Sequence, residues 1–162
     1  MLFRLAYYST NNLKKTTHPQ KSELKKIITA ARTTNRVAGI TGGLMFNRSY
    51  FAQVLEGDRT AVSDLFCRIA KDPRHSSIVI IEAGPVGHRL FDRWAMGLAE
   101  KTGIADMLNA KFGHSDGFDP TKMKAADFVS YILQMVTLEQ KLISVTVPTW
   151  VADRTAADFM EV

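Results

Sequence analysis

Along the first hundred residues, segments in which every second residue is apolar alternate with segments in which apolar residues recur every three or four positions. Strand-like segments occupy residues 3–8, 42–46 and 50–56, and a three-residue link of the length found in tight hairpins joins the last two. Apolar residues spaced by three and four positions predict two helices. Their apolar stripes are Leu24, Ile27, Ile28 and Ala31 in the first helix, and Val62, Leu65, Phe66, Ile69 and Ala70 in the second.

Flanking residues define the ends of the second helix and the start of the next strand. Asp58 is a suitable N-cap, and Pro73 ends the helix because proline lacks a backbone donor and restricts the residue before it. The run at residues 77–83 is apolar enough to predict a strand buried on both faces, and residues 93–98 predict a fifth strand. The order is therefore β-α-β-β-α-β-β.

This order predicts an α+β fold with a ferredoxin-like, five-stranded mixed sheet and both helices on one face. Residues 105–112 predict a short helix, and an apolar stripe along residues 125–142 predicts a long one that needs a surface to cover. The open face of the sheet is that surface. We therefore expect one domain at residues 1–100 and a helical extension at 101–162, in which 142–162 are a tail, an added helix or a partner-binding segment.

Composition narrows the class of protein. The formal net charge of +5 is modest, and the local lysine cluster at residues 14–26 is typical of a solvated helix face. No apolar run reaches the ~20 residues of a membrane span. A single cysteine, Cys67, forms no internal disulfide and fits a small packing residue in a reducing, cytoplasmic protein.

Gln53 is the most unusual residue of the predicted core. It shares one strand face with Phe51 and Leu55, and a buried amide costs about 1–3 kcal/mol unless it is hydrogen-bonded. The first and third strands of a split βαβ sheet are neighbours, which brings Tyr7 next to Gln53. Two interpretations remain: an amide bonded within the core, or a tyrosine–glutamine pair that contacts a polar ligand between the helices.

Five short motifs occur in order over residues 2–98. They are Arg4-Leu5-Ala6-Tyr7-Tyr8-Ser9; Asn35-Arg36-Val37-Ala38-Gly39-Ile40-Thr41-Gly42-Gly43-Leu44; Phe51-Ala52-Gln53-Val54-Leu55-Glu56-Gly57; Asp72-Pro73-Arg74-His75; and Trp94-Ala95-Met96-Gly97. Together, at this spacing, they resemble the BLUF family, the sensors of blue light using FAD. The resemblance covers about three-fifths of the chain.

The resemblance implies a non-covalent FAD held between the two helices. The photoactive residues that it implies are Tyr7, Gln53, Trp94 and Met96. The cofactor-binding residues that it implies are Tyr7, Ile28, Arg32, Asn35, Thr41, Gln53, Asp72, Arg74, His75 and Met96. Thr34 stands where some members carry histidine, so we expect contacts at that edge of the ring to differ from theirs.

The resemblance also implies a photochemical mechanism. Blue light drives an electron and a proton from Tyr7 toward the flavin with Gln53 as the relay, and the flavin ends oxidised with altered hydrogen bonds. The change then leaves through residues 93–98 and the C-terminal helices. Such a chain is not an enzyme and has no metal; it forms an oligomer or signals to a separate effector. Candidate effectors are a cyclic-di-GMP phosphodiesterase, a response-regulator-like protein or a transcription factor.

Two rival classes are weaker. An RNA-recognition module shares the βαββαβ order, but its third strand is rich in basic, glycine and aromatic residues, and residues 48–53 are a poor copy. The C-terminal helices would also cover its binding face. A hydrolase is disfavoured because the four histidines show no metal-ligand spacing and no serine lies in a nucleophile elbow.

Overall fold

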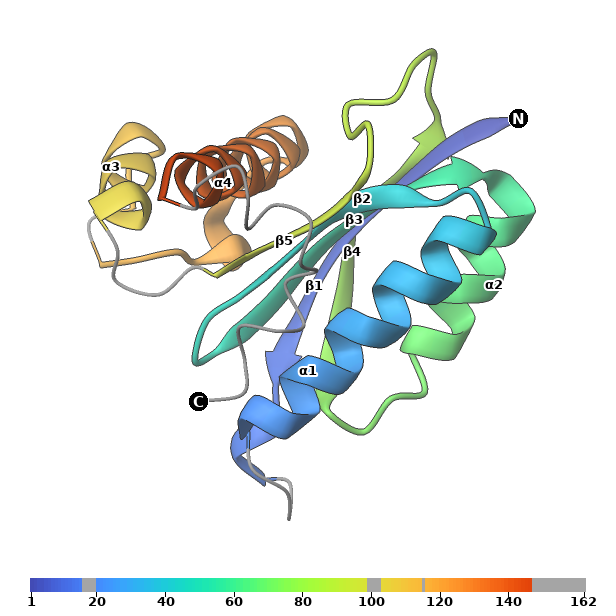
Figure 1. The fold of residues 1–162 in the computed structure, drawn as a ribbon, viewed down its shortest axis with the longest axis horizontal. Coiled ribbons are helices and arrows are strands. Elements are labelled where there is room, and N and C mark those ends of the chain that lie inside the picture. The colour runs from blue at the N-terminus through green and yellow to red at the C-terminus, as the bar shows by residue number, and fades with distance from the viewer. Residues whose placement is uncertain (16–19, 99–102, 115, 147–162) are drawn as a thin grey trace.

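The computed structural model describes residues 1–15, 20–98, 103–114 and 116–146 (Figure 1). Its strands are β1 (Leu2–Asn11), β2 (Thr41–Phe46), β3 (Tyr50–Asp58), β4 (His75–Pro85) and β5 (Trp94–Leu98). Its helices are α1 (Gln20–Ala30), α2 (Arg59–Ile69), α3 (Gly103–Lys111) and α4 (Ala125–Thr146), with short turns η1 (Leu13–Lys15), η2 (Ala31–Asn35) and η3 (Pro120–Lys122).

The strands form one mixed sheet in the order β4-β1-β3-β2-β5. The β1–β3, β1–β4 and β2–β3 pairs are antiparallel, whereas β2 and β5 run parallel. Helices α1 and α2 lie on one face of the sheet, and α4 lies on the other (Figure 1). The α+β, ferredoxin-like prediction is confirmed.

The second helix begins as its sequence predicts. The Asp58 carboxylate accepts hydrogen bonds from the backbone N–H groups of Thr60 and Ala61, and thus caps two donors that a helix N-terminus leaves free. Negative charge at this end is also favoured by the helix dipole, and the pKa of Asp58 is lowered by these backbone hydrogen bonds. The cap fixes the point at which β3 passes into α2.

Helix α4 fills the face of the sheet opposite α1 and α2. Phe128, Ile132 and Met135 are fully buried against small strand residues such as Ala52. A Cβ added to Gly43 of β2 would lie 3.0 Å from the Ile132 Cγ2, so the bare backbone permits the close approach of the helix. An RNA-recognition module would bind its ligand on this face, which is instead covered by α4.

Strand β4 corrects one prediction. It is an edge strand, not a strand buried on both faces, because it pairs only with β1. Val79 and Ile80 accordingly remain 41% and 51% exposed. An unbroken apolar run is typical of a central parallel strand, but here it belongs to an antiparallel edge.

Two further predictions concern Cys67 and the C-terminal segment. Cys67 of α2 is exposed, so its interpretation as a packing residue is wrong. Helix α4 continues to Thr146, and the open question about the chain beyond it falls on residues 147–162, which lie outside the described residues.

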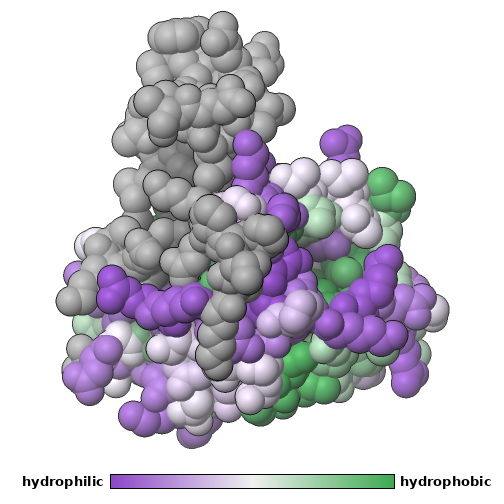
Figure 2. Space-filling model, turned by 90° about the horizontal axis from the view of Figure 1, so that it is seen from below, coloured by the Kyte–Doolittle hydropathy of each residue, from purple (hydrophilic) through white to green (hydrophobic). Residues whose placement is uncertain are grey.

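Hydrophilic side chains predominate on the face seen from below in Figure 2, with a smaller apolar area between them. Among helices of the described ranges, none has the length and apolar character required to cross a membrane.

Candidate functional site

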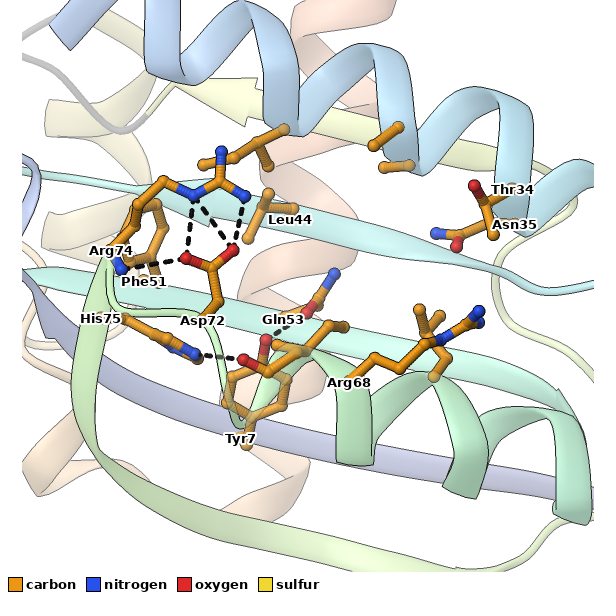
Figure 3. Close-up of a pocket in the computed structure, with 15 residues that line it drawn as sticks. Tyr7, Thr34, Asn35, Leu44, Phe51, Gln53, Arg68, Asp72, Arg74 and His75 are labelled. Atoms are coloured by element: carbon orange, nitrogen blue, oxygen red, sulfur yellow. Dashed lines mark hydrogen bonds and ion pairs between the residues drawn. The ribbon is translucent and has the colours of Figure 1, made fainter. Parts of the chain in front are cut away.

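A cavity of ≈ 320 Å³ lies between α1, α2 and the sheet. This volume falls within the range of small-molecule sites. Its walls are mostly apolar, with a few polar groups that converge from β1, β3 and the segment after α2 (Figure 3). The lining residues are Tyr7, Ile27, Ala30, Ala31, Thr34, Asn35, Leu44, Phe51, Gln53, Leu65, Arg68, Ile69, Asp72, Arg74 and His75.

Both helices present one stripe to the cavity. In α1 and η2 the stripe is Ile27, Ala30, Ala31 and Thr34, and in α2 and its C-terminal end it is Leu65, Arg68, Ile69 and Asp72. Each set follows the i, i+3, i+4, i+7 spacing of one helical face. The paired alanines carry no side chain beyond Cβ, so they leave space between helix and sheet for a flat molecule.

Tyr7 and Gln53 meet on neighbouring strands. They are direct partners in the β1–β3 register, and the Tyr7 hydroxyl donates a hydrogen bond to the Gln53 Oε1. Both side chains are buried, at 2% and 4% exposure. Burial, together with the negative charge of Asp72, raises the pKa of Tyr7 well above its ordinary value, so the phenol keeps its proton.

The direction of that hydrogen bond fixes the Gln53 amide. A protonated phenol donates to a carbonyl, so Oε1 faces Tyr7 and the Nε2 amine points away from it, as Figure 3 shows. Within the described ranges, Nε2 has no protein acceptor. A donor is therefore left for a ligand at the wall of the cavity.

Asn35 supplies a second free amide. The residue is 2% exposed, and its backbone carbonyl accepts a hydrogen bond of 2.8 Å from the Ile40 N–H. Its side chain bonds to no other residue in the part of the chain that the structure describes. Asn35 and Gln53 both line the cavity, so their amides can bind a polar ligand edge there.

Asp72 and Arg74 form the opposite end of the cavity from Asn35 (Figure 3). Partial burial would raise the pKa of Asp72, but hydrogen bonds from Arg74 outweigh it and hold that pKa below its ordinary value. Arg74 also contacts the buried carboxylate of Glu23 on α1 at 3.4 Å. This charged cluster joins α1 to the segment that follows α2.

His75 is held by both ring nitrogens. Nε2 lies 2.7 Å from the Ile69 carbonyl, which can only accept, so Nε2 carries a proton. Nδ1 lies 2.8 Å from the Ser9 hydroxyl of β1. The ring packs edge-on against Phe51, so His75 closes the cavity between Tyr7 and the start of β4.

The structure brings six of the predicted cofactor-binding residues together around the cavity: Tyr7, Asn35, Gln53, Asp72, Arg74 and His75. Ile28, Arg32 and Thr41 do not line it. Ile28 and Arg32 each stand one position after a lining residue, so they lie beside the helical face that borders the cavity. The Thr41 hydroxyl instead accepts a hydrogen bond from Arg89.

Trp94 and Met96 lie on β5, and Met96 pairs with Leu44, a lining residue of β2. Their side chains lie outside the described residues, so their predicted photoactive role remains a prediction.

Several lining residues are absent from the predicted site: Ile27, Ala30, Ala31, Thr34, Leu44, Phe51, Leu65, Arg68 and Ile69. Most belong to the apolar helix stripes, which identify a buried face in the sequence but do not distinguish a cavity wall from a packed core. Arg68 is the exception, because a charged residue on an apolar stripe is itself a signal of a polar ligand or a solvent opening.

The lining fits a flavin. Apolar side chains from two helices suit the faces of a flat aromatic ring, and the free amides of Asn35 and Gln53 suit its polar edge. Both amides border the cavity, where a bound ring can meet them.

Comparisons with known proteins agree with this fit. A family model described as sensors of blue light using FAD, BLUF, matches residues 2–97. Photoactivated adenylate cyclase subunit beta of Euglena gracilis is 34% identical over 95 residues, which are 59% of this chain but 11% of that protein. The chain thus spans about a tenth of the length of that relative.

Two solved structures are similar over most of their length. The photo-activated state of BlsA superposes with a TM-score of 0.71 and 29% identity, covering 82% of this chain and 95% of BlsA. The dark-state structure of BlrB, a BLUF protein, gives a TM-score of 0.64 and 30% identity over the same shares of the two chains.

Proposed function

The chain belongs to the BLUF family of blue-light sensors that use FAD, and on this premise we propose that it is a photoreceptor whose switch is the Tyr7–Gln53 pair. The hydrogen bond from the Tyr7 hydroxyl to the Gln53 Oε1, at the wall of a cavity that fits a flavin, carries the proposal. It joins a phenol, which can release an electron and a proton together, to an amide, which can accept that proton.

FAD, when bound, supplies absorption of blue light and an excited ring that accepts one electron. Tyr7 is the donor of that electron, and its hydroxyl proton passes to Oε1 of Gln53 in the same event. Gln53 then rotates or tautomerises, which exchanges its donor and acceptor positions. This exchange itself requires no backbone movement, and β3 adjusts afterwards to the new hydrogen bonds. Electron and proton return to Tyr7, and the altered orientation of the amide is the stored signal.

Other residues hold the cofactor. The Asn35 amide would bind the polar edge of the ring, and Gln53 Nε2 would donate to it from β3. Arg74 and His75 lie at the end of the cavity nearest Asp72, where they support the flavin tail. The raised pKa of Tyr7 keeps the proton on the phenol in darkness, as a proton donor requires.

The signal leaves through β5 and the C-terminal helices to a separate effector, and the chain itself catalyses no reaction. Residues 1–100 form the sensor, and residues 101–162 serve output or self-association. Support comes from the parallel β2–β5 pair beside the cavity and from the packing of α4 on β2, β3 and β5. Further support comes from a relative named as a photoactivated adenylate cyclase subunit.

The test is an absorption spectrum before and after blue light. The purified chain should be yellow, shift slightly to the red on illumination and recover in darkness. Tyr7→Phe should keep the flavin and lose the shift. Tyr8→Phe is the matched control. Tyr8 follows Tyr7 on β1, points to the opposite face of the sheet and makes an edge contact with Tyr50. A flavin spectrum that does not respond to light in the parent chain contradicts the proposal.

A further inference from the structure

Glu56 is a fully buried carboxylate that the cavity does not use. It lies three residues after Gln53 on β3 and has the opposite strand parity, so it belongs to the face that α4 covers. A carboxylate at 0% exposure is costly unless several donors satisfy it. The donors that satisfy the Glu56 carboxylate therefore show which segments of the chain it holds in place.

Those partners come from the connection between β4 and β5. The backbone N–H groups of Leu90 and Phe91 donate to Glu56 Oε2 at 2.9 and 3.0 Å, and Arg4 Nε donates to Oε1 at 2.7 Å. Hydrogen bonds to a charged acceptor are about twice as strong as those between neutral groups. One carboxylate thus ties residues 86–93 to two central strands.

A second tether starts from the same connection. The Arg89 guanidinium donates to the backbone carbonyl of Glu56 at 2.7 Å, to the Thr41 hydroxyl at 2.7 Å and to the Gly39 carbonyl at 2.9 Å. It therefore joins the connection to β3 and to the segment that enters β2. Thr41 pairs with Glu56 in the β2–β3 register, so it lies on the same face as Glu56, away from the cavity.

The tethered connection in turn supports α4. Phe91 is 2% exposed, and a Cβ on Gly43 would lie 3.0 Å from the Phe91 Cε1 and 3.4 Å from the Val136 Cγ1. Phe91, β2 and α4 therefore meet at one point. The Phe91 N–H that Glu56 binds belongs to the residue whose ring forms this contact.

We propose that Glu56 is a positioning residue whose carboxylate holds residues 86–93 so that the Phe91 ring packs against α4. Through this contact, the flavin-site strand β3 is coupled to that helix. The inference rests on the proposed photoreceptor function and adds to it a defined link on the opposite face of the sheet. Rearrangement of Gln53 shifts β3 locally, and the Glu56 tether carries that shift to Phe91.

The test separates light detection from its transmission. Glu56→Gln keeps the shape but replaces one acceptor oxygen with an NH₂ donor that opposes the donors of Leu90, Phe91 and Arg4. We expect this variant to bind flavin and shift to the red normally. In the parent chain, amide hydrogen exchange in α4 should differ about five-fold or more between dark and light, and in the variant this difference should disappear.

Glu82→Gln is the matched control. Glu82 also contacts Arg4, at 3.5 Å, but none of its hydrogen bonds reaches the β4–β5 connection within the described ranges. It should keep the parent difference in exchange. Phe91→Leu provides a second variant if Glu56→Gln does not fold, and it too should lose the difference while keeping the red shift.

Retention of the parent light-dependent exchange in Glu56→Gln or Phe91→Leu overturns the proposal. So does a normal flavin spectrum without the red shift in Glu56→Gln, because Glu56 would then act in the photochemistry. Failure of the parent chain to shift is a different result, and it counts against the proposed function itself.

Discussion

The two faces of the sheet use the same strands for opposite purposes. On the α1–α2 face, Tyr7 and Gln53 point toward a cavity, and Ala30 and Ala31 at the end of α1 leave it open. On the α4 face, the neighbouring residues Ala6 and Ala52 are fully buried under large side chains of the helix. Small residues thus lie at the end of α1 on the face with the cavity, and on the strands on the face that α4 fills.

Each face also holds a buried tyrosine with an amide partner. Tyr7 donates to Gln53, and Tyr131 of α4 donates to Asn109 of α3 at 2.7 Å. Burial raises the pKa of both, and Asp72 adds to the shift at Tyr7. The difference lies in their surroundings: Tyr131 stacks on Phe118 in an aromatic cluster, whereas the Gln53 amide is left with a donor free toward the cavity. A switch needs the second arrangement.

The largest expected effect is a difference in the free energy of unfolding between matched substitutions on the two faces of the sheet. Ile132→Ala removes a fully buried side chain from α4 and should lower the free energy of unfolding by about 2–5 kcal/mol. Ile27→Ala, the same change on the cavity wall, should cost about 1 kcal/mol because the side chain is only half-buried and the cavity already exists. Denaturant unfolding measures both. Equal losses would contradict the contrast between a filled face and a hollow one.

Alkaline pH should weaken the folded state through the buried tyrosines. The unfolded chain releases the Tyr7 proton near the ordinary pKa of 10.0, while the folded chain retains it, so stability falls as pH rises above 10. Each tyrosine that keeps its proton only in the folded state lowers the free energy of unfolding by about 1.4 kcal/mol per pH unit above its ordinary pKa. Tyr7→Phe should reduce the slope, measured by denaturant unfolding at pH 9 to 11, and Tyr131→Phe should also reduce it. An unchanged slope in Tyr7→Phe would show that its phenol ionises freely in the fold.

Removal of the free amide should have a smaller effect, confined to the cavity face. Asn35→Ala should weaken flavin binding roughly tenfold, the equivalent of about 1.4 kcal/mol for one lost hydrogen-bonding group. Asn109→Ala is the control from the packed face, and it should lower stability without a change in flavin affinity. Titration of the apoprotein with flavin measures both constants. Unchanged affinity in Asn35→Ala would remove that residue from the site.

Much of the fold and part of the candidate site could be predicted from local features of the sequence. The Asp58 cap, the split βαβ order and the Tyr7–Gln53 proximity follow from residues and topology alone, and all are present. The predicted α1 stripe contains Ile27 and Ala31, which line the cavity, but apolar periodicity alone does not reveal that Ala30 and Thr34 complete this wall. The Glu56 tether joins residues 34 and 35 positions apart, which no periodicity reveals.

The exposure of β4 was missed for another reason. A run of apolar residues reports hydrophobicity but not strand order, and only the order β4-β1-β3-β2-β5 places this strand at an edge. The resemblance to a known family predicted Asn35, which lines the cavity, and also Ile28, Arg32 and Thr41, which do not line it.

The light-minus-dark difference spectrum of Gln53→Leu tests the central claim most directly. Leucine keeps the volume but removes both the acceptor of the Tyr7 hydroxyl and the donor toward the cavity. The account predicts a flavin spectrum without the normal red shift, while Gln134→Leu, a change to a glutamine of α4 that bonds Ser130 and Lys111, shifts and recovers as the parent does. A normal, reversible red shift in Gln53→Leu would contradict the account.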